Sequence, residues 1–177
     1  MDRPYYLIIP TAMKKIILAL VALTCISPDT SGQTLTPKGG VAKSQKSTTT
    51  RRRIVKTDKA PQGIGVYSQA IVAGELVFTS GQIGIDPKTS QMVEGGFEAQ
   101  AEQVLRNLAT VLEAAGSDMS QVLKTTVFLA DMDDFNKMNE IYRRHFKEDP
   151  PARSTVQVAR LPRNARIEIE AVALLKK

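Results

Sequence analysis

The stretch FEAQAEQVLRNLATVLEAAGSDMSQVLKTTVFLA, residues 97–130, passes from one hydrophobic period to another. Apolar residues three and four positions apart predict an amphipathic helix over 97–116, with Gly116 as its C-terminal stop. Residues 122–130 are rich in β-branched side chains and apolar on both faces, which predicts an interior strand. The expected buried stripe of the helix consists of Phe97, Ala101, Val104, Leu105, Leu108, Leu112 and Ala115.

A second helix is expected directly after this strand. In DMDDFNKMNEIYRRHF, residues 131–146, either Asp131 or Asp133 can cap the helix. Two strands, at about 153–160 and 166–175, then close the chain. The apolar stripe of the second helix is formed by Phe135, Met138, Tyr142 and Phe146.

Upstream of residue 97 the pattern predicts strands only. Ile54–Lys56 is a short strand, and a Gly-rich loop over 63–70 leads into two apolar runs joined by a turn at 73–75. The order strand, strand, strand, helix, strand, helix, strand, strand predicts an α+β fold with two helices packed on one face of a sheet. Because several strands are apolar on both sides, further copies of the chain are expected to bury the second face.

The N-terminal part of the sequence has a different composition. Residues 13–32 have the charged, apolar and small-residue layout of a secretory signal, and we expect Met13 to be the true start. The apolar run 16–26 is too short for stable membrane insertion. This predicts a periplasmic or secreted protein, or a cytoplasmic one if the segment is not functional. Residues 33–53 are expected to be a disordered basic linker, and residues 54–177 the folded domain.

Charge and rare residues exclude several classes of function. Of the net charge of +6, residues 1–53 supply nine basic against two acidic residues (+7), and residues 54–177 fifteen against sixteen (−1). Nucleic acid is therefore not an expected partner of the core. Cys25 and His145 are the only residues of their types, which argues against a metal centre or a Ser-His-Asp triad. We expect His145 to be a solvated surface imidazole.

Charged residues inside the last two strands are the strongest sign of a site. Arg153 and Thr155 share one face of their strand, while Glu168 and Glu170 lie opposite an apolar row in the next. If these strands are neighbours, a guanidinium that can hold a carboxylate and a glutamate that can orient water approach one cleft. The alternative is a structural Arg-Glu ion pair.

Three further polar residues interrupt apolar or glycine-rich surroundings. Tyr67 and Ser80 each lie at a loop or strand end beside glycine, where they can serve either a site or local packing and turn formation. Asn139 lies next to the apolar stripe of the second helix, where it can tie down a neighbouring loop or face water.

Several motifs together closely resemble the RidA/YjgF family of enamine and imine deaminases. The motifs are GVYSQA, FTSGQIGIDPKTS, VLKTTVFLADMDDFNKMNEIY, PARSTVQVARLP and IEIEA, and they span most of residues 54–177. The resemblance implies a chorismate-mutase-like α+β fold and a homotrimer with three clefts between subunits. It also implies hydrolysis of 2-imino acids, formed from enamines such as 2-aminoacrylate, to 2-keto acids and ammonia without a cofactor or metal.

The resemblance also assigns roles to individual residues. It implies that Arg153 grips the substrate carboxylate and that Glu168 positions the attacking water. It places the backbone carbonyl of Thr155 against the imine nitrogen. The positions that it implies to line the cleft are Tyr67, Ser80, Gly81 and Asn139.

Two positions depart from the family pattern, and other functions stay open. Many relatives carry Cys where this chain has Thr155, and Pro where it has Val66. The first change leaves a backbone carbonyl in place, whereas the second loosens the loop that carries Tyr67. Alternatives are a module of the same fold that binds keto acids without turnover, and a chaperone or RNA-cleaving role, against which the near-neutral core argues.

Overall fold

The computed structural model describes residues 52–63 and 65–177. The signal-like segment 1–32 and almost all of the linker 33–53 lie outside the described residues. The first strand begins one residue before the expected strand Ile54–Lys56, because Arg53 already pairs with Val72. Its guanidinium Nη2 also donates a 2.6 Å hydrogen bond to the carbonyl of Ala115.

The described residues form one mixed sheet. Its strand order is β1-β2-β3-β7-β5-β6, and the short β4 pairs with β7. Only β5 and β6 are parallel; every other pair is antiparallel. The strands are β1 Arg53–Val55, β2 Ala70–Ala73, β3 Leu76–Thr79, β4 Gln82–Ile83, β5 Val122–Leu129, β6 Ala152–Gln157 and β7 Ile167–Leu174.

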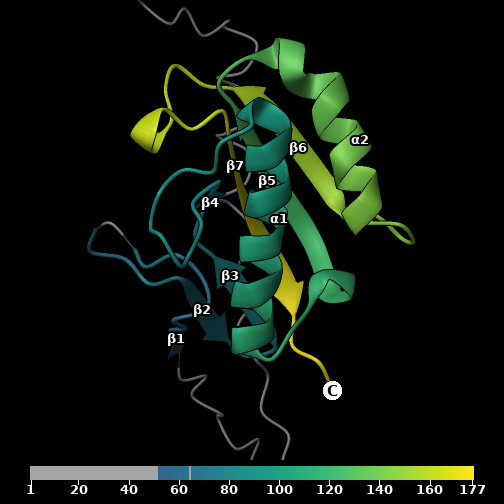
Figure 1. The fold of residues 1–177 in the computed structure, drawn as a ribbon. Coiled ribbons are helices and arrows are strands. Elements are labelled where there is room, and N and C mark those ends of the chain that lie inside the picture. The colour runs from purple at the N-terminus through teal and green to yellow at the C-terminus, as the bar shows by residue number, and fades with distance from the viewer. Residues whose placement is uncertain (1–51, 64) are drawn as a thin grey trace, which may run out of the picture. The chain divides into compact units, whose positions relative to one another are not determined.

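Two α-helices, α1 Gly96–Ala115 and α2 Phe135–His145, lie side by side on one face of the sheet, as expected (Figure 1). All seven residues of the expected α1 stripe are buried, and Gly116 ends the helix with a φ of 87°. The side chain of Asp131, not Asp133, makes the cap, and it caps the short 3-10 helix η3, Met132–Asp134, that precedes α2. Two more 3-10 turns, η2 Met119–Gln121 and η4 Pro162–Asn164, complete the fold.

The last two strands are not neighbours, which corrects the arrangement considered from the sequence. The chain leaves β5, crosses over through α2 and returns as β6 parallel to β5. It then passes to the other edge of β5 and runs back as β7. Strand β5 therefore lies between Arg153 and Glu168. The parallel β5-α2-β6 unit places β6 along one edge of β5, so β7 pairs with the other edge.

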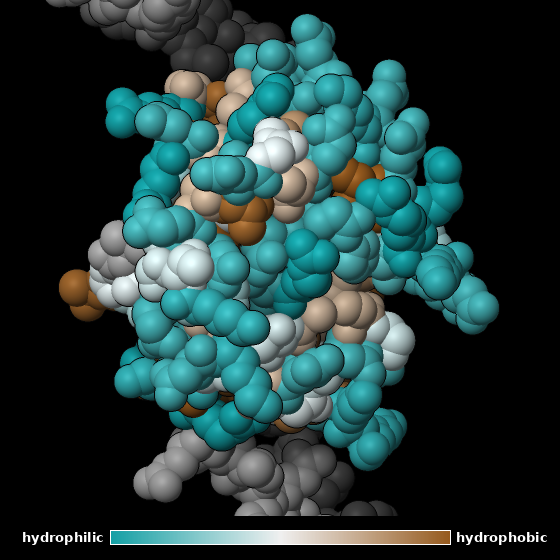
Figure 2. All heavy atoms as spheres, in the orientation of Figure 1, coloured by the Kyte–Doolittle hydropathy of each residue, from teal (hydrophilic) through white to brown (hydrophobic). Residues whose placement is uncertain are grey.

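The two faces of the sheet differ in how they are covered. Figure 2 shows that the surface over the helices is mostly hydrophilic. On the opposite side, the cross-strand row Ile54, Ile71, Phe78 and Val172 has no covering element among the described residues. We call this side, with the exposed side chains of Ile54, Phe78 and Val156, the open face. Exposed apolar side chains on a sheet face are typical of a surface that binds another chain.

No helix among the described residues has the length and apolar character needed to cross a bilayer.

Candidate active site

A pocket of about 430 Å³ surrounds the side chain of Glu168. Tyr67 reaches it from the loop before β2, Gly81 from the segment before β4, and Arg163 from η4. Its apolar walls are supplied mainly by prolines and isoleucines. The full lining, here called the Glu168 pocket, is Pro61, Gln62, Gly63, Gly65, Tyr67, Gln69, Gly81, Gln82, Ile83, Ile85, Pro162, Arg163 and Glu168.

Glu168 has the electrostatic character of a functional carboxylate. Burial, and to a smaller extent the like charge of Glu170, raises the pKa of the Glu168 carboxyl above its ordinary value. No ion pair reaches Glu168 from any described residue. A half-buried carboxylate with a raised pKa and no cationic partner is a good base for orienting or deprotonating water.

The glycine at position 81 creates the room for this carboxylate. A Cβ atom placed on Gly81 would lie 1.8 Å from Oε1 of Glu168 and 2.6 Å from its Cδ. The backbone of Gly81 therefore lies directly against the carboxyl group. Any side chain here would occupy the position that the carboxylate takes.

A second pocket, of about 370 Å³, contains Arg153 and is here called the Arg153 pocket. The guanidinium Nη2 donates a 2.7 Å hydrogen bond to Oδ1 of Asn139. The guanidinium carbon lies 4.7 Å from the ring centre of Tyr142, within the range of cation–π attraction. The lining of the pocket is Asn139, Tyr142, Arg143, Phe146, Pro150, Pro151 and Arg153.

The described residues do not form the structural Arg-Glu ion pair that was the alternative role for Arg153. Among the described residues, no carboxylate lies within ion-pair distance of its guanidinium. An arginine held by an amide and an aromatic ring keeps donors for an anionic ligand, because neither partner neutralises its charge.

Within one chain the two pockets lie on opposite faces of the sheet. Arg153 is in register with Thr125 of β5, whose buried side chain contacts α2. Glu168 is in register with Phe128, three residues further along β5 and so on the other face. Arg153 and Glu168 therefore do not share a cleft within a single chain.

The remaining candidate residues divide between site and scaffold. The side chain of Asn139 accepts a hydrogen bond from Arg153. It therefore does not serve as the loop contact, or as the residue facing only water, that were considered from the sequence. Ser80 lines neither pocket; its hydroxyl donates a 2.7 Å hydrogen bond to the carbonyl of Ser68 and holds the loop that carries Tyr67. Thr155 lines neither pocket, and its Oγ1 is buried without a hydrogen-bond partner among the described residues.

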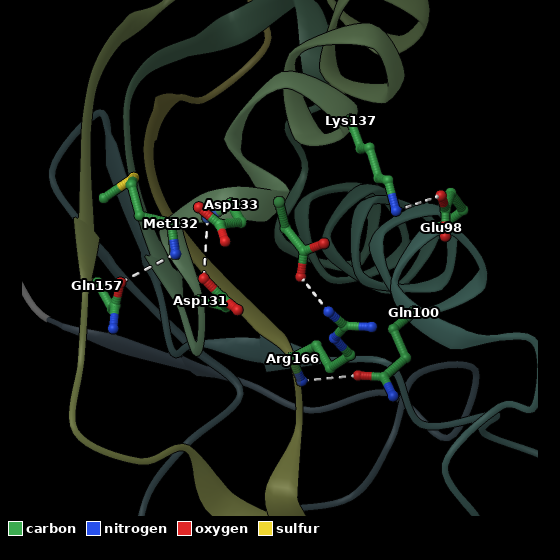
Figure 3. Close-up of polar contacts among 9 residues, drawn as sticks. Glu98, Gln100, Asp131, Met132, Asp133, Lys137, Gln157 and Arg166 are labelled. Carbon is green, nitrogen blue, oxygen red and sulfur yellow. Dashed lines mark hydrogen bonds and ion pairs between the residues drawn. The ribbon is translucent and has the colours of Figure 1, made fainter.

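Arg166, which directly precedes β7 and lies two residues before Glu168, is held by a polar cluster (Figure 3). The backbone N–H of Arg166 donates a 2.9 Å hydrogen bond to Oε1 of Gln100 in α1. The Arg166 guanidinium forms a 2.7 Å ion pair with the buried Asp134 at the end of η3. These contacts join the residue before β7 to α1 and to η3, which directly precedes α2, and so help to set where Glu168 enters its pocket.

Two sequence expectations need correction or addition. His145 is not a free surface imidazole: its Nε2 lies 2.8 Å from Oε2 of Glu102, which joins α2 to α1. Arg163, which lines the Glu168 pocket, was not expected, because it lies in a turn without periodicity. No group of three or more metal-ligating side chains occurs in residues 52–63 and 65–177.

Comparison with known proteins identifies the family. Residues 57–175 match the family described as Endoribonuclease L-PSP. The chain belongs to this family. It is the RidA/YjgF family whose motifs the sequence resembles.

Individual RidA-family members are similar over the whole folded domain. Human 2-iminobutanoate/2-iminopropanoate deaminase is 53% identical over 123 residues, which cover 70% of this chain and 90% of that protein. RidA from Psychrobacter is 45% identical, with a TM-score of 0.68 over 70% of this chain and 99% of that one. Escherichia coli TdcF with bound serine is 40% identical, with a TM-score of 0.67 over 70% of this chain and 99% of that one.

Proposed function

We propose that this chain hydrolyses reactive 2-imino acids and their enamine tautomers, of the 2-aminoacrylate type, to 2-keto acids and ammonia. The observation that carries this proposal is the 53% identity to a human imine deaminase across nearly all of that protein. The half-buried carboxylate of Glu168 and the guanidinium of Arg153, which has no ion-pair partner among the described residues, suit this chemistry. The product is a stable keto acid, so the reaction removes a reactive metabolite.

The reaction needs only binding and water activation. Arg153 holds the substrate carboxylate, and Glu168 orients the water. The oxygen of that water bonds to the C=N carbon while a proton reaches the nitrogen, which gives a carbinolamine. The hydroxyl proton of the carbinolamine then passes to the amino nitrogen, the C–N bond breaks, ammonia leaves, and the oxygen stays on the carbon as the keto group. Imines react readily with aligned water, so the proposed mechanism uses no metal or cofactor.

The site is proposed to lie between subunits of a homotrimer. Two half-sites on opposite faces of one chain cannot meet, whereas the Arg153 pocket of one subunit can meet the Glu168 pocket of its neighbour. The exposed apolar side chains of the open face support association of several chains. Light scattering of the folded domain tests the assembly, and a monomeric mass would refute it.

The activity is tested by supplying the imine directly. An amino-acid oxidase generates 2-iminobutanoate, and keto-acid and ammonia release are followed with and without the protein. Arg153→Ala and Glu168→Gln are expected to lower kcat/KM at least tenfold, with Glu113→Gln, an exposed glutamate of α1, as the control. Tight keto-acid binding without turnover would instead support the binding-module alternative.

We also propose that residues 13–32 direct export, so that the mature protein is periplasmic or secreted. The proposal rests on the layout of charged, apolar and small residues in that segment. Cell fractionation with N-terminal sequencing of the mature protein tests it. An intact N-terminus in the cytoplasmic fraction would refute export.

A further inference from the structure

Arg153 is held by more than the Asn139 side chain expected at the site. Tyr142 of α2 places the face of its ring 4.7 Å from the guanidinium carbon. The Sδ atom of Met138 lies 3.5 Å from Nη1 and is a weak acceptor. The guanidinium is thus bounded on several sides by α2, the helix that covers its strand.

The ring of Tyr142 is itself fixed from below. Its hydroxyl forms a 2.7 Å hydrogen bond with Oγ1 of Thr125, and Thr125 is completely buried. Thr125 is the residue of β5 that stands in register beside Arg153. The strand neighbour of the arginine therefore anchors the ring on which the arginine lies.

We propose that Tyr142, anchored by Thr125, is a positioning residue that orients the Arg153 guanidinium for the substrate carboxylate. The inference rests on the proposed function, because it assumes that Arg153 binds that carboxylate. Tyr142 itself touches no reacting atom. A flexible arginine loses rotamer freedom when it binds a ligand, and a ring that already holds the guanidinium reduces that loss.

Three substitutions at two positions separate the effect of the Tyr142 ring from that of its hydrogen bond to Thr125. Tyr142→Leu removes the aromatic face and is expected to raise KM for 2-iminobutanoate about tenfold, with kcat changed by less than about threefold. Tyr142→Phe and Thr125→Val each break the anchoring hydrogen bond but keep a ring. They are expected to raise KM by about two- to fivefold each, and their combination by no more than either alone.

A double-mutant cycle with Arg153→Lys shows whether Tyr142 acts through the arginine. Lysine keeps the charge but lacks the planar group that lies over the ring. In that background Tyr142→Leu is expected to raise KM by less than about twofold, whereas a purely structural role would repeat the full increase. The same increase in both backgrounds overturns the proposal.

The outcomes remain decisive if one variant is unstable. Thermal unfolding and light scattering establish which variants are folded and assembled. If Tyr142→Leu does not fold, an unchanged KM in both Tyr142→Phe and Thr125→Val overturns the inference, and an equal, non-additive increase supports it. Failure of Arg153→Ala to reduce activity would instead refute the proposed role of Arg153, which is a separate result.

Discussion

The carboxylate of Glu168 lies in the space that a side chain at position 81 would fill. The residue at position 81 therefore decides where the carboxylate lies. The clash that a Cβ would make involves Oε1, Cδ and also Cγ of Glu168, so it reaches beyond the carboxyl group at the end of the side chain. Glu168 is fixed at its backbone by pairing with Ile83 and Phe128. The side chain must therefore rotate away if a methyl group is added.

Gly81→Ala is expected to lower kcat/KM for imine hydrolysis at least tenfold, because the displaced carboxylate no longer orients water. Gly65→Ala is the matched control. It lines the same pocket, but its new Cβ would lie 3.5 Å from the Tyr67 ring, an ordinary contact. Equal activity in the two variants would show that the position of Glu168 does not matter.

Thr155 and Thr125 predict opposite effects of the same substitution. Oγ1 of Thr155 is buried without a partner, so Thr155→Val removes an unsatisfied group and is expected to stabilise the protein by about 1 kcal/mol. Thr125→Val removes the hydrogen-bond partner of the Tyr142 hydroxyl and is expected to destabilise the protein by about 1–3 kcal/mol. Urea unfolding measures both, and destabilisation by Thr155→Val would contradict the first expectation. Activity should persist in Thr155→Val if only the backbone acts.

Glu170 predicts a shift in the pH dependence. If Glu168 acts as a carboxylate, kcat/KM falls as the pH drops through its pKa, and the raised pKa places this fall above the range of an ordinary glutamate. Glu170→Gln removes the like charge, lowers the pKa of Glu168 and moves the fall to lower pH. The measurement is the pH profile of kcat/KM, with Glu113→Gln as control. A shift to higher pH would contradict this assignment.

At the scale of elements, periodicity predicted both helices and the main strands. The α1 stripe and the β2–β3 hairpin have strong local signals, namely regular apolar spacing and Gly74 with a φ of 64° at the turn. The two-residue β4 was missed because so short a segment has no period. Strand neighbours were also beyond local pattern: β6 and β7 follow each other in sequence, yet β5 lies between them.

The same limit applies to the candidate site. Charges in apolar strands marked Arg153 and Glu168, polar side chains beside glycine or an apolar stripe marked Tyr67 and Asn139, and the family resemblance added Gly81. These residues line the two pockets. The pattern did not reveal Tyr142 as the support of Arg153, because a tyrosine in an apolar helical stripe has the same appearance as a core residue. For Ser80 the pattern left a site role and a turn role open, since a serine beside glycine fits both, and the structure shows its hydroxyl bonded to the carbonyl of Ser68.

The cap of η2 ties the C-terminal end of the chain to the fold. Asp118 accepts hydrogen bonds from the backbone of Ser120 and Gln121 and forms an ion pair with Lys176. The bond to Lys176, and then that to Ser120, lowers the pKa of Asp118 from 3.8 to about 2. The stabilisation from this charge is therefore complete above about pH 4 and is lost as the pH falls toward 2.

Two variants separate the cap from the charge. Asp118→Ala is expected to lower the free energy of unfolding by about 1 kcal/mol at neutral pH, because the cap is lost. Asp118→Asn keeps a capping oxygen, so it should lose less at neutral pH and none of its stability through this position in acid. Urea unfolding at several pH values between 2 and 7 measures both. Identical acid sensitivity in Asp118→Asn and wild type would contradict the role given to the charge.

At the scale of the molecule, each chain carries two separate parts of the proposed site, the Arg153 pocket and the Glu168 pocket, and neither is complete by itself. The helices cover one face and bring Arg153 against α2, while Glu168 belongs to the other face with the loops before β2 and β4. The open face carries exposed apolar side chains that no described part of the chain covers. Both features are explained if neighbouring subunits bury the open face and join the two pockets into one cleft.

Mixed assemblies give this arrangement a direct test. Arg153→Ala and Glu168→Gln, each nearly inactive alone, are co-expressed with different tags, and the mixed oligomers are purified. If each cleft takes its arginine from one subunit and its glutamate from the next, a mixed trimer of either composition keeps both residues intact in one cleft of three. About a third of wild-type activity should therefore return, although no chain in the mixture carries both residues. If the two residues had to act within one chain, no cleft would be complete and activity would stay at the level of the separate variants.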